Sequence, residues 1–345
     1  MIIDGKKIDE LHKPYLVAEL SANHGGSIER AKESIRAAAK TGISAVKIQS
    51  YTPDSMTIKC NKKEFFISEG LWAGSQLYDL YENAHTPYEW HEELFDCAKK
   101  ENITLFSTPF DENAVDLLEE LNVPAFKIAS FEIIDIPLIK YIASKNKPIL
   151  LSTGMSSLNE IDEALKTIRE ITDQDVLLFH CISSYPTPIS ESNLANINFL
   201  KEKFGVQVGL SDHTTSNLAA TVAIGMGAVA IEKHFKLDEN ECGPDSSFSL
   251  NIEQLFNLVS DCTSAWEAKG KTAFNRSKLE KDNLVFRRSI YFVKDLKKGE
   301  IIKKDDIKRI RPGYGLKPKY FDSLIGKVVI KDVERGDPLK WDLIE

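Results

Sequence analysis

Residues 45–50 read Ala45-Val46-Lys47-Ile48-Gln49-Ser50, a short β-rich run that ends in polar residues. Seven more runs of this kind follow or precede it within the first 250 residues, and amphipathic helical segments separate most of them. Alternating β and α units predict a parallel sheet. Eight such units in this length favour a (β/α)8 barrel, in which the chemistry lies at the carboxyl ends of the strands. The predicted strands are Tyr15–Leu20, Ala45–Ser50, Leu105–Thr108, Ala125–Ile128, Pro148–Ser152, Val176–His180, Gln207–Ser211 and Val229–Lys233.

A doubly wound open sheet is the alternative arrangement of such units. That fold usually places a glycine-rich turn after its first strand, and the chain has no GxGxxG motif. The sequence therefore predicts an α/β protein of the (β/α)8 TIM-barrel type.

The 345 residues leave room for a small domain after the barrel. We expect the barrel to span residues 1–270, with an insertion at about 53–86, because the connection after Ser50 is far longer than a helix requires. Insertions of this length in βα loops usually serve the active-site face. A polar linker is predicted at 271–286 and a second domain, rich in short β-like runs such as Ser289–Val293 and Lys327–Ile330, at 287–345.

Composition excludes several classes of protein. Basic residues number 44 and acidic residues 52, so the net charge is −8, and no basic cluster predicts binding to nucleic acid. No apolar run is long enough to span a membrane, and the first residues do not resemble a secretory signal. The five cysteines, one of them Cys242, are scattered and show no metal-binding or disulfide pattern. A reducing cytoplasm is the location these features favour.

Strand alternation places two lysines inside the predicted barrel. Val46 and Ile48 share the apolar face of their strand, so Lys47 and Gln49 point inward, and the same argument turns Lys127 inward. A buried lysine requires an anion or a carboxylate beside it. A structural ion pair, for example with Glu19, would satisfy one lysine, whereas two lysines at equivalent places favour an anionic ligand. A Schiff-base lysine is the other functional interpretation.

Hydroxyl and imidazole groups follow the predicted strands. A single serine in such a place is usually a helix cap, but a set of hydroxyls beside two lysines suits phosphate and carboxylate groups. His213 and His234 follow neighbouring strands and could reach one divalent ion, such as Mn²⁺, Mg²⁺, Fe²⁺ or Zn²⁺. Further acidic candidates at the same strand ends are Glu19, Glu132, Asp212, Asp238 and Asp245.

At this level of detail the chain resembles the sialic acid synthase family, whose members condense phosphoenolpyruvate (PEP) with an N-acetylated sugar aldehyde. The resemblance covers nearly the whole chain, and residues 287–345 are similar to the C-terminal antifreeze-like (SAF) domain of that family. It rests on Glu19-Leu20-Ser21-Ala22-Asn23-His24, Val46-Lys47-Ile48-Gln49, Ser107-Thr108-Pro109-Phe110, Lys127-Ile128-Ala129-Ser130, Ser152-Thr153-Gly154-Met155, Ser211-Asp212-His213, Glu232-Lys233-His234 and Arg311-Pro312-Gly313.

The resemblance implies a role for each matching residue. The implied PEP-binding residues are Lys47, Thr108, Lys127, Ser130, Ser152, Ser183 and Ser211. His213 and His234 match ligands of a divalent metal, Mn²⁺ above all. The implied sugar-binding residues are Glu19, Gln49, Tyr185, Asp245, Phe286 and Arg311, and the implied catalytic residues are Glu132, Glu19 and Lys127. The resemblance further implies a homodimer in which the SAF domain covers the barrel of the other subunit.

The sugar substrate follows from finer features. Ser183 stands where N-acetylneuraminate synthases usually have asparagine. The insertion, with Leu71-Trp72-Ala73-Gly74 and Leu77-Tyr78-Asp79-Leu80-Tyr81, resembles the pseudaminic acid synthase branch, whose substrate is a 2,4-diacetamido-2,4,6-trideoxy sugar in the altro configuration. N-acetylneuraminate and legionaminic acid synthases are the nearest alternatives. More distant ones are a Schiff-base pyruvate aldolase that uses Lys47, Lys127 or Lys233, and a non-enzymatic sugar-binding or ice-binding protein.

Overall fold

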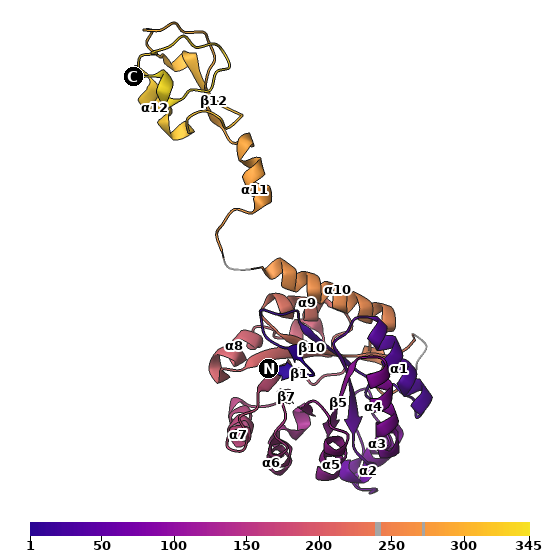
Figure 1. Cartoon of the computed structure of the whole chain (residues 1–345). Coiled ribbons are helices and arrows are strands. Elements are labelled where there is room, and N and C mark those ends of the chain that lie inside the picture. Colours follow the sequence, from indigo (N-terminus) through magenta and orange to yellow (C-terminus); the bar gives the residue numbers. More distant parts are fainter. Residues whose placement is uncertain (239–242, 271–272) are drawn as a thin grey trace. The chain divides into compact units, whose positions relative to one another are not determined.

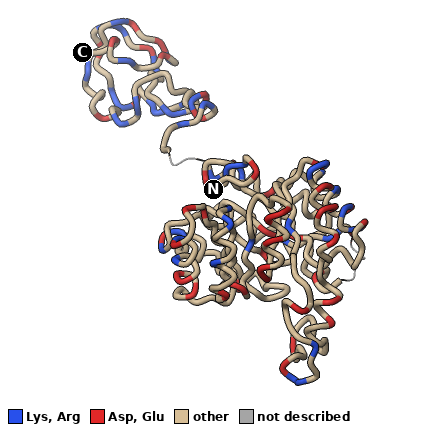
Figure 2. Tube along the Cα trace, turned by 60° about the horizontal axis from the view of Figure 1, so that its bottom comes forward, with Lys and Arg blue, Asp and Glu red and all other residues tan. Residues whose placement is uncertain are grey.

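The computed structural model describes residues 1–238, 243–270 and 273–345, and the chain divides into two compact units, Met1–Gly270 and Lys271–Glu345 (Figure 1). The units differ in charge. Residues 1–270 contain 24 basic and 40 acidic residues, a net charge of −16, whereas residues 271–345 contain 20 basic and 12 acidic residues, a net charge of +8 (Figure 2). The overall charge of −8 therefore conceals an acidic first unit and a basic second unit.

The first unit is a closed barrel of eight parallel strands, which confirms the predicted fold. Each strand pairs with the next along the chain, and the last closes on the first through His234 opposite Glu19. Every predicted strand is present with bounds that differ by one residue at most. The strands are β3 (Tyr15–Glu19), β4 (Ala45–Ser50), β5 (Thr104–Pro109), β6 (Phe126–Ile128), β7 (Ile149–Ser152), β8 (Val176–Cys181), β9 (Gln207–Asp212) and β10 (Ala230–His234).

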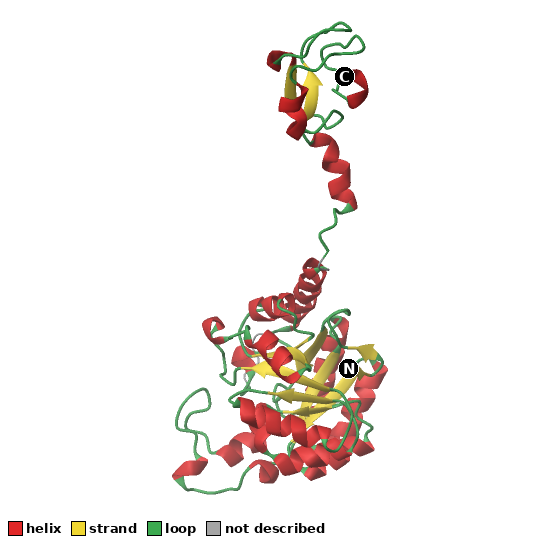
Figure 3. Ribbon diagram, turned by 90° about the vertical axis from the view of Figure 1, so that its left-hand side faces the viewer, coloured by secondary structure: helices red, strands yellow, loops and turns green. Residues whose placement is uncertain are grey.

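Helices surround the barrel and cover the apolar outer face of its strands (Figure 3). Several begin at a side chain that caps the free N–H groups of the first turn, as Ser27, Asp111 and Ser157 do. No helix in the described part of the chain is both long and apolar enough to cross a membrane. The barrel helices are α1 (Ile28–Lys40), α4 (His91–Lys100), α5 (Glu112–Glu120), α6 (Ile136–Ser144), α7 (Leu158–Arg169), α8 (Asn196–Phe204), α9 (Leu218–Gly225) and α10 (Ile252–Lys269).

A short hairpin closes the end of the barrel where the strands begin. Its strands are β1 (Ile2–Ile3) and β2 (Lys6–Lys7), and Ile3 belongs to the barrel core. Asp4 accepts a hydrogen bond of 2.9 Å from the Thr104 hydroxyl at the start of β5. The opposite end, where the strands finish, is thus the end that is left for a site.

The inserted segment 53–86 contains three short helices, namely α2 (Pro53–Met56), η1 (Lys63–Phe65) and α3 (Leu77–Ala84). The following short helix η2 (Tyr88–Trp90) leads into α4. Inside the barrel wall, His91 of α4 bonds to the Ser50 hydroxyl at 2.6 Å, and Ser50 in turn bonds to Ser107 at 2.6 Å. These buried hydrogen bonds connect the start of α4, which follows the insertion, to strands β4 and β5.

The second unit contains α11 (Lys278–Asp282) and η6 (Asn283–Phe286) and then a small core of its own around Ile290, Phe292 and Val329. The antiparallel strands β11 (Ser289–Phe292) and β12 (Ile307–Ile310) form its sheet. The run predicted at Lys327–Ile330 is no regular strand, because it makes only isolated bridges, Ile301 with Val328 and Val329 with Ile344. Its remaining short helices are η7 (Lys304–Asp306), η8 (Pro318–Tyr320), α12 (Phe321–Leu324) and η9 (Trp341–Leu343).

Candidate active site

Two lysines and two carboxylates meet inside the barrel. Lys47 of β4 places its Nζ 2.7 Å from Oε2 of Glu19, at the end of β3. Lys127 of β6 places its Nζ 3.2 Å from Oε1 of Glu232 on β10, and the same oxygen lies 3.6 Å from Nζ of Lys47. All four side chains are almost fully buried. The ion pair with Glu19 that could account for one lysine is therefore present, and Glu232 joins both lysines.

Burial and charge act in opposite directions on these groups. Burial raises the pKa of Glu19, and Lys47 offsets only part of that effect. Burial would also raise the pKa of Glu232, but Lys127 and Lys47 outweigh it and hold that pKa below its usual range. Glu19 is thus the carboxylate that takes up a proton first, and its protonation would leave a net positive charge for an anionic ligand.

Two of the predicted PEP-binding hydroxyls contact this group of lysines and glutamates. Thr108 Oγ1 accepts a bond of 3.1 Å from Lys47, and Ser211 donates to Glu232 over 3.4 Å. Ser152 has a buried hydroxyl oxygen with no protein partner among the described residues. The strand ends therefore place Thr108 and Ser211 beside the lysines and glutamates, and they leave the Ser152 hydroxyl available to a ligand.

Gly154 marks a close approach of two more of these hydroxyls. A Cβ atom at Gly154 would lie 2.2 Å from Ser183 Oγ and 2.8 Å from Ser130 Oγ, so a larger residue would displace these two hydroxyls. The Gly154 N–H donates to Ser130 Oγ at 3.0 Å. Two hydroxyls that lie so close together, one of them oriented by a backbone N–H, suit the oxygens of a phosphate or carboxylate.

The two histidines lie with their ring centroids 5.5 Å apart. His213 Nδ1 donates to the Ile182 carbonyl at 3.0 Å, which leaves Nε2 with its lone pair in that tautomer. His234 Nδ1 is buried without a hydrogen-bond partner, and burial lowers the pKa of His234 well below its usual range, so this ring is neutral. A neutral imidazole with an unused nitrogen is the form that binds a divalent metal.

Within residues 1–238, 243–270 and 273–345 no three His, Cys, Asp or Glu side chains form a group that could hold a metal. Asp245 Oδ2 lies 3.8 Å from His234 Nδ1. The donor set of two imidazoles therefore fits a metal ion whose remaining ligands are water and substrate.

Three predicted sugar-binding residues lie at the same mouth. Gln49 donates from Nε2 to Glu19 at 3.0 Å and to Ser21 at 3.0 Å. The Tyr185 ring lies 4.3 Å from the His213 ring, and Asp245 accepts from the backbone N–H of Ala22 at 3.5 Å. Phe286 and Arg311 are exposed residues of the second unit, and their assignment to the sugar site stays a prediction.

Glu132 is the acidic residue whose environment best suits proton transfer. It lies in the short helix η3 (Ser130–Ile134) directly after β6. Its Oε2 is buried without a hydrogen-bond partner, and burial raises the pKa of the carboxyl to about 7. A carboxyl group with such a pKa exchanges protons readily near neutral pH.

Three residues that the sequence offered as candidates lie elsewhere. Lys233 turns to the helix-facing side of β10, where its Nζ lies 2.7 Å from Asp212 Oδ2 and 2.6 Å from the Thr214 carbonyl. This pair removes both Lys233, as a Schiff-base lysine, and Asp212, as a helper at the mouth. Asp238 is exposed and pairs with Arg30 at 3.2 Å.

Glu232 is the residue of the mouth that the sequence interpretation did not single out. It stands two positions before His234 on the same strand, so strand alternation puts both on the inner face. That alternation is the signal that could have identified it.

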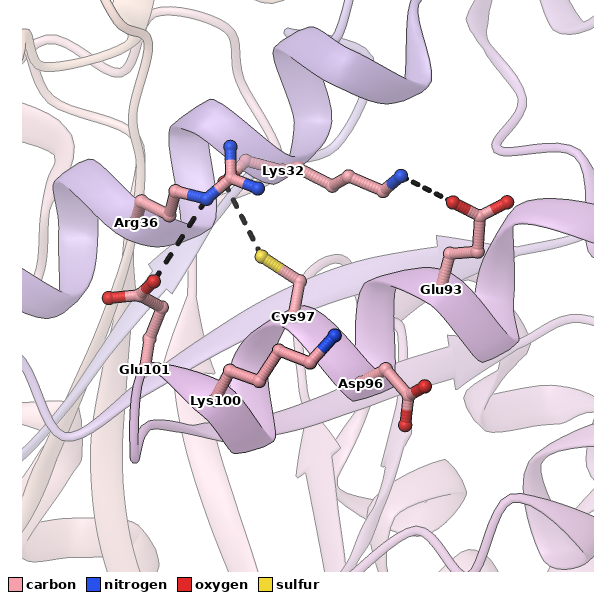
Figure 4. Close-up of a pocket in the computed structure, with 7 residues that line it drawn as sticks. All are labelled: Lys32, Arg36, Glu93, Asp96, Cys97, Lys100 and Glu101. Carbon is pink, nitrogen blue, oxygen red and sulfur yellow. Dashed lines mark hydrogen bonds and ion pairs between the residues drawn. The ribbon is translucent and has the colours of Figure 1, made fainter.

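The pocket that Figure 4 shows lies away from these residues, on the outside of the barrel between α1 and α4. It measures about 190 Å³, and no predicted site residue lines it. Four of its charged residues form two ion pairs, Lys32 with Glu93 and Arg36 with Glu101, and the Cys97 thiol donates to the Lys32 carbonyl. The four described cysteines are free thiols, and Cys242 lies outside the described residues.

The strands and their polar ends define a (β/α)8-barrel protein with a charged mouth, followed by a small second domain with a two-stranded sheet. Residues 34–273 match the NeuB family, and residues 287–345 match the SAF domain. The chain belongs to the NeuB family, which confirms the resemblance drawn from the strand-end motifs.

Relatives match over nearly the full length. The chain is 44% identical to a pseudaminic acid synthase of Campylobacter jejuni, over 95% of this chain and 96% of that protein. It is 41% identical to the pseudaminic acid synthase of Helicobacter pylori, over 97% and 99% of the two chains. Among solved structures, the N-acetylneuraminic acid synthetase of Leptospira borgpetersenii in complex with citrate matches with a TM-score of 0.74 and 28% identity, over 82% of this chain and 94% of that one.

Proposed function

We propose that this chain is a pseudaminic acid synthase, a transferase that forms a C–C bond between PEP and 2,4-diacetamido-2,4,6-trideoxy-altropyranose. The products are pseudaminic acid and inorganic phosphate. The relationship at 41–44% identity supports the reaction and the sugar. The observation that carries the proposal is the joint position of Lys47 and Lys127 on Glu232, beside two neighbouring histidines at the barrel mouth.

The reaction makes a C–C bond and a bond from a water oxygen to C2 of PEP, and it breaks the C–O bond between C2 and the phosphate. C3 of PEP attacks the aldehyde carbon of the open-chain sugar, and the aldehyde oxygen takes up a proton to become a hydroxyl. Water adds to C2 of the former PEP and loses one proton. The C2 hydroxyl of the tetrahedral intermediate then passes its proton to the departing phosphate as the C–O bond breaks, which leaves a ketone at C2. The proton that water releases balances the one that the aldehyde oxygen gains.

The residues of the mouth divide these tasks. Lys47 and Lys127 neutralise the carboxylate and phosphate of PEP and the negative charge that develops in the transition state. Ser130 and Ser183 donate from their hydroxyls to phosphate oxygens, and the Gly154 N–H, which donates to Ser130 Oγ, orients the Ser130 hydroxyl. Glu132, whose pKa of about 7 populates both protonation states at neutral pH, passes the proton between water and the sugar oxygen.

We propose His213 and His234 as the ligands of a divalent ion, with Mn²⁺ the ion that the family resemblance favours. The ion would act as a Lewis acid that polarises the sugar's carbonyl oxygen. The unused Nδ1 of His234 and the hydrogen bond from His213 to Ile182 support this assignment. The cytoplasmic location expected from the sequence stays a prediction.

We further propose that two copies form a homodimer in which the SAF domain of one covers the barrel mouth of the other. The net charges of −16 and +8 on the two units favour such an association. Phe131, in η3 after β6, and Met155, in the turn after β7, are large apolar side chains exposed at the mouth, where a second surface would cover them. Arg311 is exposed in the SAF domain and can donate to the acetamido oxygens of the sugar.

Phosphate release tests the proposed reaction. PEP and the purified protein are assayed with the diacetamido altro sugar, the legionaminic precursor and N-acetylmannosamine, each with and without a chelator. We expect release with the first sugar, and we expect chelation to abolish it. Equal or better turnover of N-acetylmannosamine would overturn the sugar assignment. Full activity in chelator, or inactivation by borohydride in the presence of pyruvate, would instead indicate a Schiff-base aldolase.

A further inference from the structure

A hairpin inside the insertion carries a tryptophan at its tip. Phe66 and Gln76 form its antiparallel base, and Gly74 donates its N–H to the Ile67 carbonyl at 2.8 Å. Gly70 and Gly74, with φ of +86° and +87°, allow the turn that places Trp72 between them. The Gln76 side chain donates to the Cys60 carbonyl at 2.8 Å, which fixes the base of the hairpin. The hydrogen bonds of the hairpin thus fix the position of Trp72 within the insertion.

Trp72 joins two loops of the barrel mouth that are far apart in sequence. Its indole Nε1 donates to the Pro244 carbonyl at 3.0 Å, in the loop after β10. Its ring lies 5.7 Å from the ring of Tyr185, which belongs to the loop after β8. The residue after Pro244 is Asp245, close to His234. Trp72 therefore contacts both loops that supply predicted sugar-binding residues.

The aromatic contacts continue from Trp72 into the mouth. Tyr185 lies 5.1 Å from the Phe248 ring, and Phe248 lies 4.9 Å from the His234 ring, all measured between centroids. Trp72 and Phe248 have no charged group, and the Tyr185 hydroxyl is the only polar group that Tyr185 adds. The wall between the hairpin and the histidines is therefore mainly apolar.

We propose that Trp72 is a specificity-determining residue, which with Tyr185 forms the apolar wall against which the methyl and acetamido groups of the sugar pack. This inference rests on the proposed function and names the residue that selects its sugar. A sugar hydroxyl against such a wall loses its hydrogen bonds to water without a replacement, whereas a methyl group gains apolar contact. One methyl or methylene group in an apolar pocket changes kcat/KM by about 10–200-fold.

The test compares sugars rather than absolute rates. Wild type, Trp72→Ala, Trp72→Phe and Leu71→Ala are assayed for kcat/KM with the diacetamido altro sugar and with N-acetylmannosamine, at saturating PEP. Leu71 is the matched control, because it is an exposed apolar neighbour on the same hairpin tip. We expect Trp72→Ala to reduce the preference for the diacetamido sugar by about 10-fold or more. Leu71→Ala should retain the wild-type preference.

Further measurements separate the explanations. KM for PEP and the thermal unfolding midpoint should be the same in Trp72→Ala as in wild type, which excludes a general loss of structure. Trp72→Phe keeps an aromatic ring but loses the bond to Pro244, so it should retain most of the preference. An unchanged preference in Trp72→Ala, with wild type active on the diacetamido sugar, overturns the role of Trp72 alone. Wild type that does not use the diacetamido sugar overturns the proposed function, and this inference with it.

Discussion

Lys127 Nζ lies 3.2 Å from Glu232 Oε1 in the interior of the barrel, and the same oxygen lies 3.6 Å from Lys47 Nζ. The two ammonium groups thus share one carboxylate, whose pKa they hold below its usual range against the effect of burial. A carboxylate in contact with two cations occupies the place where an anionic substrate would receive the strongest attraction. In the proposed reaction, this pairing would keep the two buried lysines in position before PEP binds.

Replacing Lys127 by alanine should remove a charge-assisted contact to PEP. Such contacts contribute about 1.5–3 kcal/mol, so we expect kcat/KM for PEP to fall by about 10–100-fold or more. Steady-state kinetics with varied PEP measure the effect. Lys140→Ala, which removes an exposed lysine of α6, is the control and should change nothing. A value for Lys127→Ala within about twofold of wild type, compared with that expected loss, would show that Lys127 does not bind PEP.

The sequence predicts those parts of this arrangement that depend on neighbouring residues, and not those that depend on residues far apart in the chain. Alternation along a strand needs only neighbouring residues, so Lys47 and Lys127 could be turned inward from the sequence, and the eight strands could be placed to within a residue. The partner of Lys127 is 105 residues away, and only the closed barrel brings it into contact. The same holds for Trp72, which meets Pro244 across 172 residues.

The structure does not support the interpretation of Lys233 as a Schiff-base lysine. A Schiff-base lysine would have to face the mouth, but Lys233 is adjacent to His234 on β10, and adjacent strand residues face opposite sides. The consistent use of alternation on β10 would have replaced Lys233 by Glu232.

Glu132 should impose a pH dependence on the reaction. Its pKa of about 7 predicts that kcat/KM changes with an apparent pKa near neutrality. Glu132→Gln should lower kcat by about 10²–10⁴-fold and remove this transition from the pH–rate profile. Glu120→Gln, an exposed change on α5, is the control. A pH–rate profile of Glu132→Gln that retains both the amplitude and the midpoint of the transition would assign the proton transfer to another group.

The same carboxyl should lower the stability of the protein at high pH. A folded-state pKa of about 7, above the ordinary 4.5, means that folding favours the protonated form, so stability is lost as the pH rises from about 4.5 through 7. Glu132→Gln should therefore raise the thermal unfolding midpoint at pH 8 and leave it nearly unchanged at pH 4. A lower midpoint for Glu132→Gln at pH 8 than for wild type would contradict this assignment.

His91 should make stability depend on pH in the acidic range. Burial lowers the pKa of His91 to about 4, and its Nε2 lies 2.6 Å from the Ser50 hydroxyl. The unfolded chain binds a proton at about 6.5, so stability falls as the pH decreases from about 6.5 to 4. His91→Gln should flatten this part of the curve, measured by urea unfolding at several pH values. The matched variant His85→Gln should keep the wild-type slope, and an equal slope in His91→Gln would contradict the prediction.

The proposed homodimer can be tested by activity measurements, without a structure of the interface. If Arg311 of one subunit completes the site that contains Lys127 of the other, then Lys127→Ala and Arg311→Ala should each be nearly inactive alone. In a heterodimer of the two variants, one site lacks both residues and the other has both. Co-expression with two different affinity tags and purification through both yields this heterodimer, and about half of its sites should be active. If Arg311 instead served its own barrel, every site would lack either the lysine or the arginine, and activity would stay at the level of the single variants.

The matched control combines Lys127→Ala with Lys47→Ala, two residues of the same barrel, so that no site of that heterodimer regains both lysines. Restored activity in the first pair and none in the second would establish that the SAF domain acts on its partner. Purified heterodimers of the first pair that remain inactive would refute it.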